Sequence, residues 1–336
     1  MGVQQTGDVM RIAIIGAGLA GLACAARLTG AGRQVSLFDK GRGPGGRMSS
    51  RRVATALGEA GFDHGAQYFT ARDAGFHAQV EQWHREGLVA PWPAAGPDCW
   101  VGTPAMNAPL EQLAASLPIR WNTRVESLSG SPGSWTLHGP GRGNAETDGD
   151  VLQEGRFDAV LLAVPAENAA PLLGGLAPDL AAIAEATPAR PCWTVMAAFA
   201  DRLPADSDVL KQDDGPTAWI ARNSSKPGRA GPEAWIIQAG PAWSREHLEQ
   251  SPDEIVPLLL AALASRVGAA LPTLLTASAH RWRYARSGNA QKTASWDSVL
   301  GLGLCGDWLM GPRVECAWVS GVQLAAAVTG QVGQAA

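Results

Sequence analysis

Apolar and polar residues follow one another in blocks along the first forty positions, and the blocks have the lengths of a strand, a helix and a second strand. Residues 12–15 (IAII) are apolar throughout and run into a glycine-rich turn. An alanine- and leucine-rich stretch over 19–28 comes next, and a second apolar run ends at Phe38. Short continuous apolar runs are typical of strands buried on both faces, so the pattern predicts a β–α–β unit with parallel strands.

Further along the chain the period of the apolar positions changes several times, which separates further helices from further strands. Helices are predicted over residues 76–88, 107–117 and 253–269, and from about 315 onward. Strands are predicted over residues 62–70, 119–128, 134–138, 157–164, 192–200, 218–222, 234–239, 279–286 and 300–305. The strands between 192 and 239 follow one another without helices, which favours an antiparallel sheet.

The order of these elements is interleaved, because the last strand and helix look like the completion of the unit that opens the chain. A length of 336 residues also suggests more than one core. We therefore predict an α/β fold in which a second domain, built on an antiparallel sheet, is inserted into a Rossmann-like domain. The dinucleotide-binding domain is predicted over 11–72, 101–166 and 287–336, and the substrate domain over 73–100 and 167–286.

The turn after the first strand reads GAGLAG over residues 16–21. Gly16 allows a tight turn, Gly18 lets the backbone approach a pyrophosphate, and Gly21 lets helix and strand pack closely. The pyrophosphate would lie at the helix N-terminus, which favours an anion. Asp39, at the end of the second strand, is placed to accept hydrogen bonds from a ribose diol. The motif predicts a dinucleotide site and leaves FAD and NAD open.

Composition bears on partners and surroundings more than on fold. The net charge is −4 and no long basic run occurs, which argues against nucleic acid as a partner. None of the five cysteines lies in a CxxC pair or beside clustered histidines, so no metal site is predicted. An odd number of cysteines without a signal peptide favours a reducing compartment, the cytoplasm. The longest apolar run, residues 256–264, is too short to span a membrane.

Three further segments favour FAD over NAD. Residues 43–48 (GPGGRM) combine glycines that let a loop pass a diphosphate with Arg47, which can bind it. Ala163 ends a strand predicted to lie beside the cofactor. Asp307 is placed to hold a ribityl or phosphate-side hydroxyl, and the last helix begins a few residues later. The N–H groups at its start can point at the flavin edge that gains negative charge on reduction.

With these residues together, the chain resembles the flavin amine-oxidase superfamily and, within it, the bacterial renalases. The similarity extends over nearly the whole chain from Arg11. The motifs that carry it are GAGLAGLACA (16–25), FDKGRGPGGRMSS (38–50), DHGAQYFTARD (63–73), WVGTPAMN (100–107), WIARNSSKP (219–227), HRWRYAR (280–286) and LCGDWLMGPRVECAWVSG (304–321). Two positions depart from it: Cys316 stands where relatives often carry glycine, and Gln238 where relatives often carry histidine.

The resemblance implies a two-domain fold of the p-hydroxybenzoate-hydroxylase type that binds FAD without a covalent link. It implies a small-molecule dinucleotide substrate, the 2- and 6-dihydro isomers of NAD(P), which are oxidised to NAD(P)⁺. Dioxygen would take the electrons from the flavin and become hydrogen peroxide. The residues expected to bind the cofactor are Gly16, Ala17, Gly18, Leu19, Ala20, Gly21, Asp39, Lys40, Gly46, Arg47, Met48, Gln67, Tyr68, Val125, Ala163, Asp307, Val314, Glu315, Ala317 and Trp318.

Hydride transfer from a dihydropyridine requires stacking of the rings and exclusion of water rather than a strong base. We therefore expect neither a Ser/His/Asp triad nor a carboxylate pair. Packing in a core is an equally good interpretation of any one tryptophan, and salt bridges at a solvated edge are an equally good one for the arginines. With those alternatives open, aromatic rings to shape the site are expected from Tyr68, Trp282, Tyr284 and Trp308. Cations for the substrate pyrophosphate are expected from Arg222, Arg281, Arg283 and Arg286. The residues expected to act in catalysis are Tyr68, Arg222, Gln238, Trp282 and Trp308.

Two other functions fit the sequence. One is a related flavin oxidase or dehydrogenase that acts on an amine, a carotenoid-like or a porphyrinogen-like substrate. The other is a flavin- or NAD-binding protein without turnover. His64 lies beside Asp63 and is expected to be a hydrogen-bonded structural histidine rather than a base, and the same is expected of His280.

Overall fold

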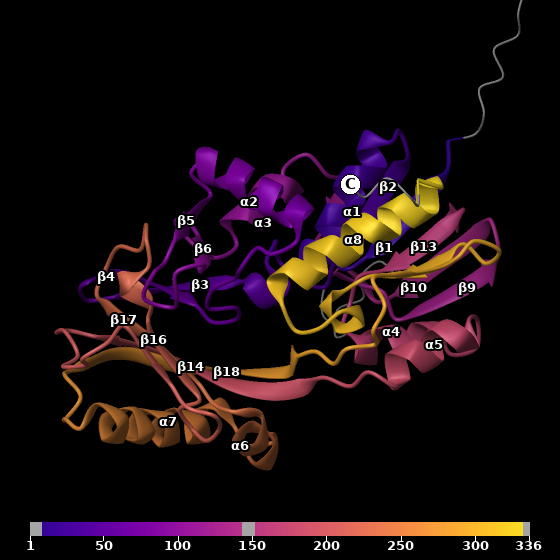
Figure 1. The fold of residues 1–336 in the computed structure, drawn as a ribbon. Helices are drawn as coiled ribbons and strands as arrows, with labels where there is room; N and C mark the ends of the chain where they lie inside the picture. Colours follow the sequence, from indigo (N-terminus) through magenta and orange to yellow (C-terminus); the bar gives the residue numbers. More distant parts are fainter. Residues whose placement is uncertain (1–8, 143–151, 332–336) are drawn as a thin grey trace, which may run out of the picture. The chain divides into compact units, whose positions relative to one another are not determined.

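The computed structural model describes residues 9–142 and 152–331, and the chain divides into two compact units. Unit 1 comprises Met1–Gly46, Leu110–Pro188 and Ser287–Ala336, and unit 2 comprises Arg47–Pro109 and Ala189–Arg286. Each unit is therefore assembled from segments that are far apart in the sequence. In Figure 1, where colour follows the sequence, the yellow C-terminal helix lies beside the indigo N-terminal helix within unit 1.

Unit 1 is built on a mainly parallel sheet whose strand order, within the described residues, is β19-β20-β13-β1-β2-β7. β20 pairs in parallel with β13, so a segment close to the C-terminus completes the sheet that β1 and β2 open. β13 is buried on both faces, as its continuous apolar sequence predicts. The strands are β1 (Arg11–Ile15), β2 (Gln34–Phe38), β7 (Ile119–Arg120), β13 (Ala159–Leu162), β19 (Ser295–Asp297) and β20 (Leu302–Leu304).

Different layers cover the two faces of this sheet. On one face α1 (Leu19–Gly30) lies along α8 (Val314–Thr329), as both figures of the fold show, and the helices are in such close contact that a Cβ on Gly321 would lie 2.1 Å from the Ala20 carbonyl oxygen. On the other face Ala13 and Ile15 share a core with Trp135 and Leu137. That layer consists of β9 (Ser127–Ser131), β10 (Ser134–Gly139), β12 (Leu152–Phe157), α4 (Ala166–Leu173) and α5 (Pro178–Glu185).

Unit 2 is built on an antiparallel sheet with the order β15-β16-β17-β14-β18 among the described residues. Its core lies on both faces, because β14 places Trp193 and Val195 against one helix and Met196 and Ala198 against a hairpin. The helix is α7 (Pro252–Val267), which begins with a capping box between Ser251 and Glu254. The sheet strands are β14 (Arg190–Phe199), β15 (Val209–Lys211), β16 (Trp219–Arg222), β17 (Glu233–Gln238) and β18 (Leu274–Arg286), and the hairpin is β3 (Ser50–Thr55) with β4 (Gly58–Asp63).

Three one-turn helical segments in the described part of the chain contribute residues to the sites below. They are η1 (Gly46–Met48), η2 (Asn223–Ser225) and η3 (Asp307–Leu309). No helix among the described residues combines the length and apolar character needed to cross a bilayer. The remaining elements are α2 (Ala74–Arg85), β5 (Val89–Pro91), β6 (Trp100–Gly102), α3 (Ala108–Ala114), β8 (Thr123–Arg124), β11 (Gly141–Arg142) and α6 (Pro241–Glu246).

The fold class is confirmed: a Rossmann-like α/β unit is combined with an antiparallel-sheet unit. The compact units follow different boundaries from those predicted. Residues 47–72 and 101–109 belong to unit 2, because the β3–β4 hairpin packs Ala60 and Phe62 on the antiparallel sheet. Residues 167–188 belong to unit 1, because α4 and α5 share its core.

Two strand predictions were wrong in detail. The strand predicted over 62–70 ends at Asp63, and the residues after it form a loop with one isolated bridge at Phe69. The single strand predicted over 119–128 is three short strands, β7, β8 and the start of β9. Asn122 interrupts it with a positive φ of 54°, a left-handed conformation that ends a strand and that asparagine adopts more readily than most residues.

Candidate functional site

The turn from β1 to α1 accepts only glycine at two of its positions. Gly16 has φ of +105°, and a Cβ there would lie 2.5 Å from the Ala163 carbonyl oxygen. A Cβ on Gly21 would lie 2.0 Å from the Gly16 carbonyl oxygen. Both contacts are too short for any side chain, so these glycines bring the helix start against the ends of β1 and β13. Ala163, predicted to lie beside the cofactor, therefore adjoins the glycine turn.

Gly18 is different, because a Cβ on it would meet no atom within 4 Å. It is the N-cap of α1, and in the described residues the helix start has neither a side-chain cap nor an acidic residue in its first turn. The first four N–H groups of a helix lack intrahelical acceptors, and here Leu19, Ala20 and Gly21 are buried. Open space beside uncapped N–H groups fits the diphosphate of a dinucleotide.

The carboxylate of Asp39 holds this turn in place. Ala17 N–H and Gly41 N–H each donate to one of its oxygens at 2.6 Å. Each carboxylate oxygen has a second lone pair, so acceptance from a ribose diol, as predicted, remains compatible with these bonds. The Thr123 N–H donates to the Asp39 carbonyl oxygen at 2.8 Å, which brings the segment containing Val125 beside the turn. Lys40 is exposed in the same loop.

Two of the predicted site residues, Asp307 and Trp308, lie in the C-terminal segment of unit 1. Asp307 is 7% exposed and accepts a hydrogen bond from the Ser287 hydroxyl at 2.9 Å. Trp308 was expected to shape the catalytic site, but it is 1% exposed, and its indole N–H donates to the Val164 carbonyl oxygen at 3.1 Å. It is a core residue of unit 1, so its predicted catalytic role is wrong.

The start of α8 carries the remaining predicted cofactor residues of unit 1. Val314 and Ala317 are partly exposed, whereas Glu315 and Trp318 are buried. Arg313, the N-cap, places its guanidinium 3.1 Å from the Glu315 carboxylate. The exposed positions fall on one side of the first turn, where a ligand could reach the N–H groups, and their contact with FAD stays a prediction.

In unit 2, the loop that follows β4 is fixed against the GGRM segment. The Ala66 N–H donates to the Arg47 carbonyl oxygen at 2.8 Å, and a Cβ on Gly65 would lie 2.0 Å from the same oxygen. Met48 is buried. Gln67 is also buried, and its side-chain amide donates to the Asp63 and Gly65 carbonyl oxygens. The Gln67 side chain is therefore engaged in holding the loop.

A buried charge cluster anchors the same loop, and sequence reasoning missed it. Asp63, 1% exposed, accepts from the Ser50 hydroxyl at 2.7 Å, from Lys226 Nζ at 3.1 Å and from Arg229 Nη2 at 2.5 Å. Burial would raise the pKa of this carboxyl, but Lys226 and Arg229 outweigh burial and hold it well below its usual range. Lys226 Nζ also donates to Gln67 Oε1 at 3.2 Å. The DHGAQ and SSKP motifs, far apart in sequence, were the available signal.

Next to this loop lies a cavity of about 450 Å³ that we call the Tyr68 pocket. Tyr68 stacks on Trp219, with ring centroids 5.3 Å apart and an interplanar angle of 30°. The Gln238 side chain donates to the Gly65 carbonyl oxygen at 2.8 Å. Burial and the neighbouring Cys99 raise the pKa of Tyr68, so its phenol stays protonated at neutral pH. The pocket is lined by Tyr68, Pro191, Cys192, Lys211, Gln212, Asp213, Ala218, Trp219, Gln238, Ala239, Gly240, Pro241 and Arg286.

The structure therefore brings together two of the predicted catalytic residues, Tyr68 and Gln238, and leaves Trp282 out of the pocket. Trp282 stacks on His64 with centroids 5.2 Å apart and donates to the His64 carbonyl oxygen at 2.8 Å. His280 meets both rings edge to face. Burial lowers the pKa of His64 and of His280 to about 4, so both are neutral at pH 7, and the expected hydrogen bond is present for His64, whose Nε2 lies 3.4 Å from the Ser49 hydroxyl.

Three of the four arginines predicted to meet substrate are paired inside unit 2. Arg222 is 4% exposed and binds Asp208 at 2.6 Å and Glu233 at 3.0 Å. Arg281 and Arg283, on one side of β18, both pair with Glu249. The predicted catalytic role of Arg222 is therefore wrong, because its charge is compensated and buried. Arg286 differs from these, since it lines the Tyr68 pocket.

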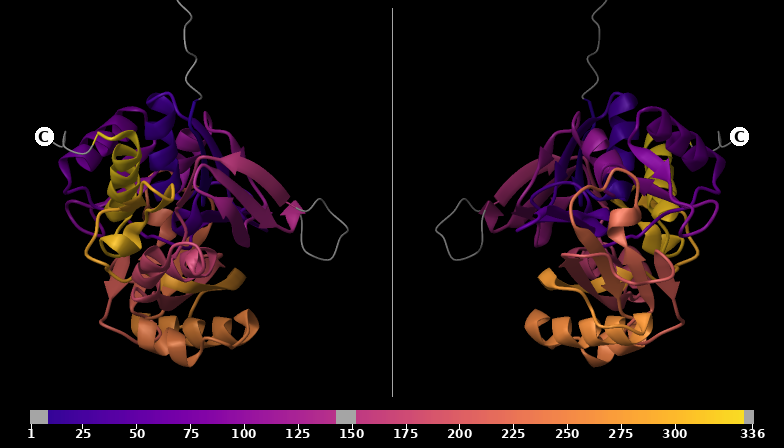
Figure 2. Two further views of the ribbon diagram at one scale, coloured as in Figure 1. Left: turned by 90° about the vertical axis from the view of Figure 1, so that its right-hand side faces the viewer. Right: turned by 90° about the vertical axis from the view of Figure 1, so that its left-hand side faces the viewer.

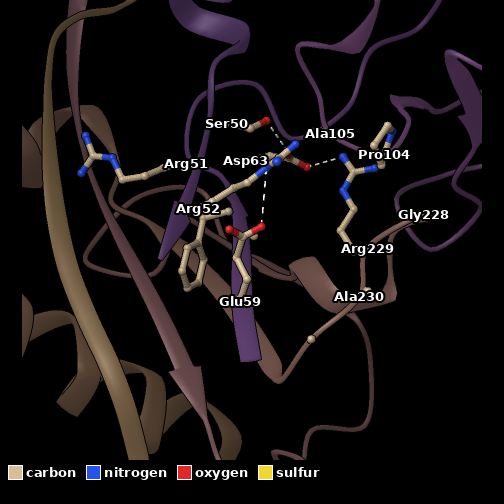
Figure 3. Close-up of a pocket in the computed structure, with 13 residues that line it drawn as sticks. Ser50, Arg51, Arg52, Glu59, Asp63, Pro104, Ala105, Gly228, Arg229 and Ala230 are labelled. Atoms are coloured by element: carbon tan, nitrogen blue, oxygen red, sulfur yellow. Dashed lines mark hydrogen bonds and ion pairs between the residues drawn. The ribbon is translucent and has the colours of Figure 1, made fainter. Parts of the chain in front are cut away.

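Figure 3 shows a second cavity of unit 2, about 320 Å³ in volume, between the β3–β4 hairpin and residues 228–231. Arg229 points at Asp63 in this view, whereas Arg51 points away from that pair. Arg52 and Glu59 approach each other at 3.8 Å. Because carboxylates compensate most of its cations, this cavity has no clear preference for an anion.

Comparisons with known proteins agree with this architecture. Residues 14–84 match the NAD(P)-binding Rossmann-like domain, and residues 84–329 match the flavin containing amine oxidoreductase family. The chain belongs to the flavin-containing amine oxidoreductase family. Members of such a family use FAD, and the glycine turn, the uncapped start of α1 and Asp39 of unit 1 fit its adenosine and diphosphate.

Similar structures and sequences of the amine oxidoreductase type are distant in identity. A cyclohexylamine oxidase from Brevibacterium oxydans has a TM-score of 0.70 at 14% identity, with 97% of this chain and 100% of that chain covered. A protein named as a protoporphyrinogen oxidase from Exiguobacterium has a TM-score of 0.72 at 13% identity, with 96% and 99% covered. These likenesses show the fold alone.

A curated relative, the tRNA 5-methylaminomethyl-2-thiouridine biosynthesis bifunctional protein of Magnetococcus marinus, is 28% identical over 221 residues. The match covers 51% of this chain and 31% of that protein. A 4,4'-diapophytoene desaturase of Staphylococcus haemolyticus is 58% identical over 40 residues, which are 12% of this chain and 8% of that protein. The chain thus spans less than a third of the length of the curated relatives that it matches.

Proposed function

We propose that this protein is an FAD-dependent oxidase of isomeric dihydronicotinamides, the 2- and 6-dihydro forms of NAD(P), as in the renalases that it resembles. The observation that carries the proposal is the composition of the Tyr68 pocket. A stacked tyrosine and tryptophan offer a flat aromatic wall, and the cations Lys211 and Arg286 line the same cavity. This combination suits a flat, uncharged dihydropyridine ring attached to an anionic nucleotide.

The residues of the chain would act by binding and orienting. FAD, held by the glycine turn and Asp39 of unit 1, would supply the redox chemistry, as acceptor of a hydride from the substrate ring and donor of two electrons to dioxygen, which with one proton from water would give hydrogen peroxide. Tyr68 and Trp219 would stack against the dihydropyridine and exclude water. The Gln238 side chain, whose NH₂ group is bound to Gly65, would offer its carbonyl oxygen to the substrate carboxamide. No general base is required, because the ring becomes aromatic as it loses hydride.

An amine oxidase is the second candidate, and the family membership favours it. Its substrate is an amine that carries a positive charge at neutral pH before it reacts. Lys211 and Arg286 in the pocket would repel that charge, which favours the dihydronicotinamide proposal. The five cysteines are free thiols, which supports the further proposal of a reducing, cytoplasmic location.

Anaerobic reduction of the purified flavoprotein tests the proposal. Mixing with 2- or 6-dihydro-NAD(P) is expected to bleach the flavin absorbance within seconds, and admission of air should restore it with formation of hydrogen peroxide. The ordinary 4-dihydro-NAD(P) and primary amines are the controls, and neither should bleach it. Bleaching by amines alone would establish an amine oxidase, and no bleaching by any donor would indicate a flavin-binding protein without turnover.

A further inference from the structure

The basic residues around the antiparallel sheet of unit 2 fall into two groups. Arg222, Arg281 and Arg283 each pair with a carboxylate, as described above. Lys211 and Arg286 pair with no carboxylate within the residues that the structure describes, and both line the Tyr68 pocket. A cation at a cavity that has no carboxylate partner can bind an anionic ligand, whereas the charge of a paired cation is already compensated.

Lys211 is held in position by two rings of the pocket and by a carbonyl outside its lining. Its Nζ lies 4.7 Å from the centroid of the Trp219 ring and 5.9 Å from that of Tyr68, and it donates to the Ala95 carbonyl oxygen at 3.2 Å. An ammonium has three donors, so two remain for a ligand. The ammonium therefore lies over the aromatic wall with donors to spare.

Arg286 is exposed at the end of β18, opposite Arg190 in the register with β14. Like charges directly across a strand pair destabilise a sheet, and among the described residues neither arginine has a carboxylate partner to relieve this. Arg286 lines the pocket together with Cys192 and Tyr68, and its charge lowers the pKa of both against the larger effect of burial. Asp213 is the carboxylate among the lining residues, so two cations face one anion.

We propose that Lys211 and Arg286 bind a phosphate group of the substrate, so that the Tyr68 pocket selects dihydronicotinamide nucleotides over the same ring without phosphate. Arg286 supplies a planar fork that matches two phosphate oxygens, and Lys211 supplies a point charge beside the aromatic wall. The ring preference rests on the proposed function. The phosphate preference rests on the two unpaired cations.

A kinetic cycle of two substrates and two variants tests the proposal in the flavin-loaded enzyme. The substrates are 6-dihydronicotinamide mononucleotide and its riboside, which differ only in the phosphate. With the mononucleotide, Lys211→Gln and Arg286→Gln are each expected to raise KM about tenfold with little change in kcat, because a contact made equally before and during reaction is lost. With the riboside, the variants should match the unaltered enzyme, whose KM should already be high. Arg286→Lys should recover part of the loss.

Arg281→Gln is the matched control, since Arg281 lies on the same strand but pairs with Glu249, and it should leave both substrates unaffected. Equal KM values for mononucleotide and riboside in the unaltered enzyme would overturn the proposal. An equal rise in KM for both substrates in the variants would overturn it too, because the two residues would then maintain the shape of the pocket rather than bind the phosphate.

A second measurement separates this inference from the proposed function. Titration of the flavin-loaded protein with inorganic pyrophosphate in a calorimeter needs no turnover. Binding that weakens about tenfold in Lys211→Gln and Arg286→Gln, but not in Arg281→Gln, supports the anion site even if no dihydronicotinamide is oxidised. Absence of pyrophosphate binding, or binding that the two variants leave unchanged, would overturn it whatever the substrate proves to be.

Discussion

Asp63 joins more segments of unit 2 than its place at a strand end suggests. It accepts from the Ser50 hydroxyl, the Met106 N–H, Lys226 and Arg229. Through Lys226 it also reaches Gln67, the neighbour of Tyr68. A single buried carboxylate thus determines where the loop that carries the pocket tyrosine runs.

Replacement of Lys226 by methionine is expected to destabilise the protein strongly. The side chain is fully buried, and burial lowers the pKa of Lys226 to about 8 in spite of Asp63 beside it. Without the ammonium, Asp63 keeps Arg229 but loses one buried partner, so the free energy of unfolding should fall by about 3 kcal/mol. Urea unfolding at pH 7 measures this. Lys292→Met, at an exposed site, is the control, and equal stability of the two variants would contradict the role assigned to the pair.

The paired histidines predict how stability depends on pH. The folded-state pKa of His64 and of His280 is about 4, lowered from 6.5 by burial, for His64 also by His280, and for both by the nearby Arg51. Between pH 6.5 and 4 the unfolded chain therefore binds more protons than the folded one. Stability is therefore complete above pH 6.5 and is lost progressively as the pH falls towards 4. His280→Asn should reduce the difference in urea midpoint between pH 7 and pH 4.5. The exposed His77→Asn should not, and identical pH dependence in both would refute the assignment.

Whether a predicted site residue lines the pocket depends on its tertiary surroundings, since a charge can be paired elsewhere and a ring can be buried in a core. Tyr68 lies in a motif and Gln238 was selected as a departure from the resemblance, and both line the pocket. Arg222 lies within an equally specific motif, yet Glu233 neutralises it, and Trp308 adjoins a predicted cofactor residue yet fills a core. Lys211 lies in no motif, and its position over Trp219 arises only from the pairing of β15 with β16. Burial and ion pairing are tertiary properties, which the sequence pattern does not contain.

Among the elements, the β1–α1 unit was the most predictable. Its apolar run, its glycines and the acid at the end of β2 all constrain the same turn, so local sequence and tertiary structure agree. The β3–β4 hairpin was missed, since its sequence is rich in arginine, glycine and alanine and is only partly apolar. Packing of Ala60 and Phe62 on the antiparallel sheet, rather than strand propensity, stabilises it.

The start of α1 gives a prediction about the cofactor. Gly18 has a φ of −76°, which alanine adopts readily, and a Cβ there meets no protein atom within 4 Å. Gly18→Ala should therefore leave the stability of the flavin-free protein unchanged while weakening FAD binding at least about tenfold, because the methyl group occupies space that the diphosphate needs. Gly30→Ala, at the other end of the same helix and equally open, is the control for FAD affinity. Unchanged affinity in Gly18→Ala would place the diphosphate elsewhere.

For the molecule as a whole, cofactor binding is coupled to folding, because the cofactor-binding unit is assembled from segments that are far apart in the sequence. Unit 1 is made from three separate segments: β20 pairs with β13, and α8 packs on α1 where Gly321 approaches Ala20, so all three segments build the unit that carries the glycine turn. A ligand that binds only this completed unit stabilises it by mass action, by about 2.7 kcal/mol at a hundred times its dissociation constant.

Removal of FAD should therefore lower the melting temperature, and its return should raise it. For a chain of this size the shift is expected to be about 5 °C at saturating FAD, measured by calorimetry on deflavinated and reconstituted protein. The Gly18→Ala variant, at the same FAD concentration, should show only about half of this shift if its affinity is tenfold lower, because RT ln(1 + 10) is about 1.4 kcal/mol. If FAD left the melting temperature of the unaltered protein unchanged, the native fold would not bind FAD. Any ligand that binds the folded state alone must shift the equilibrium towards that state.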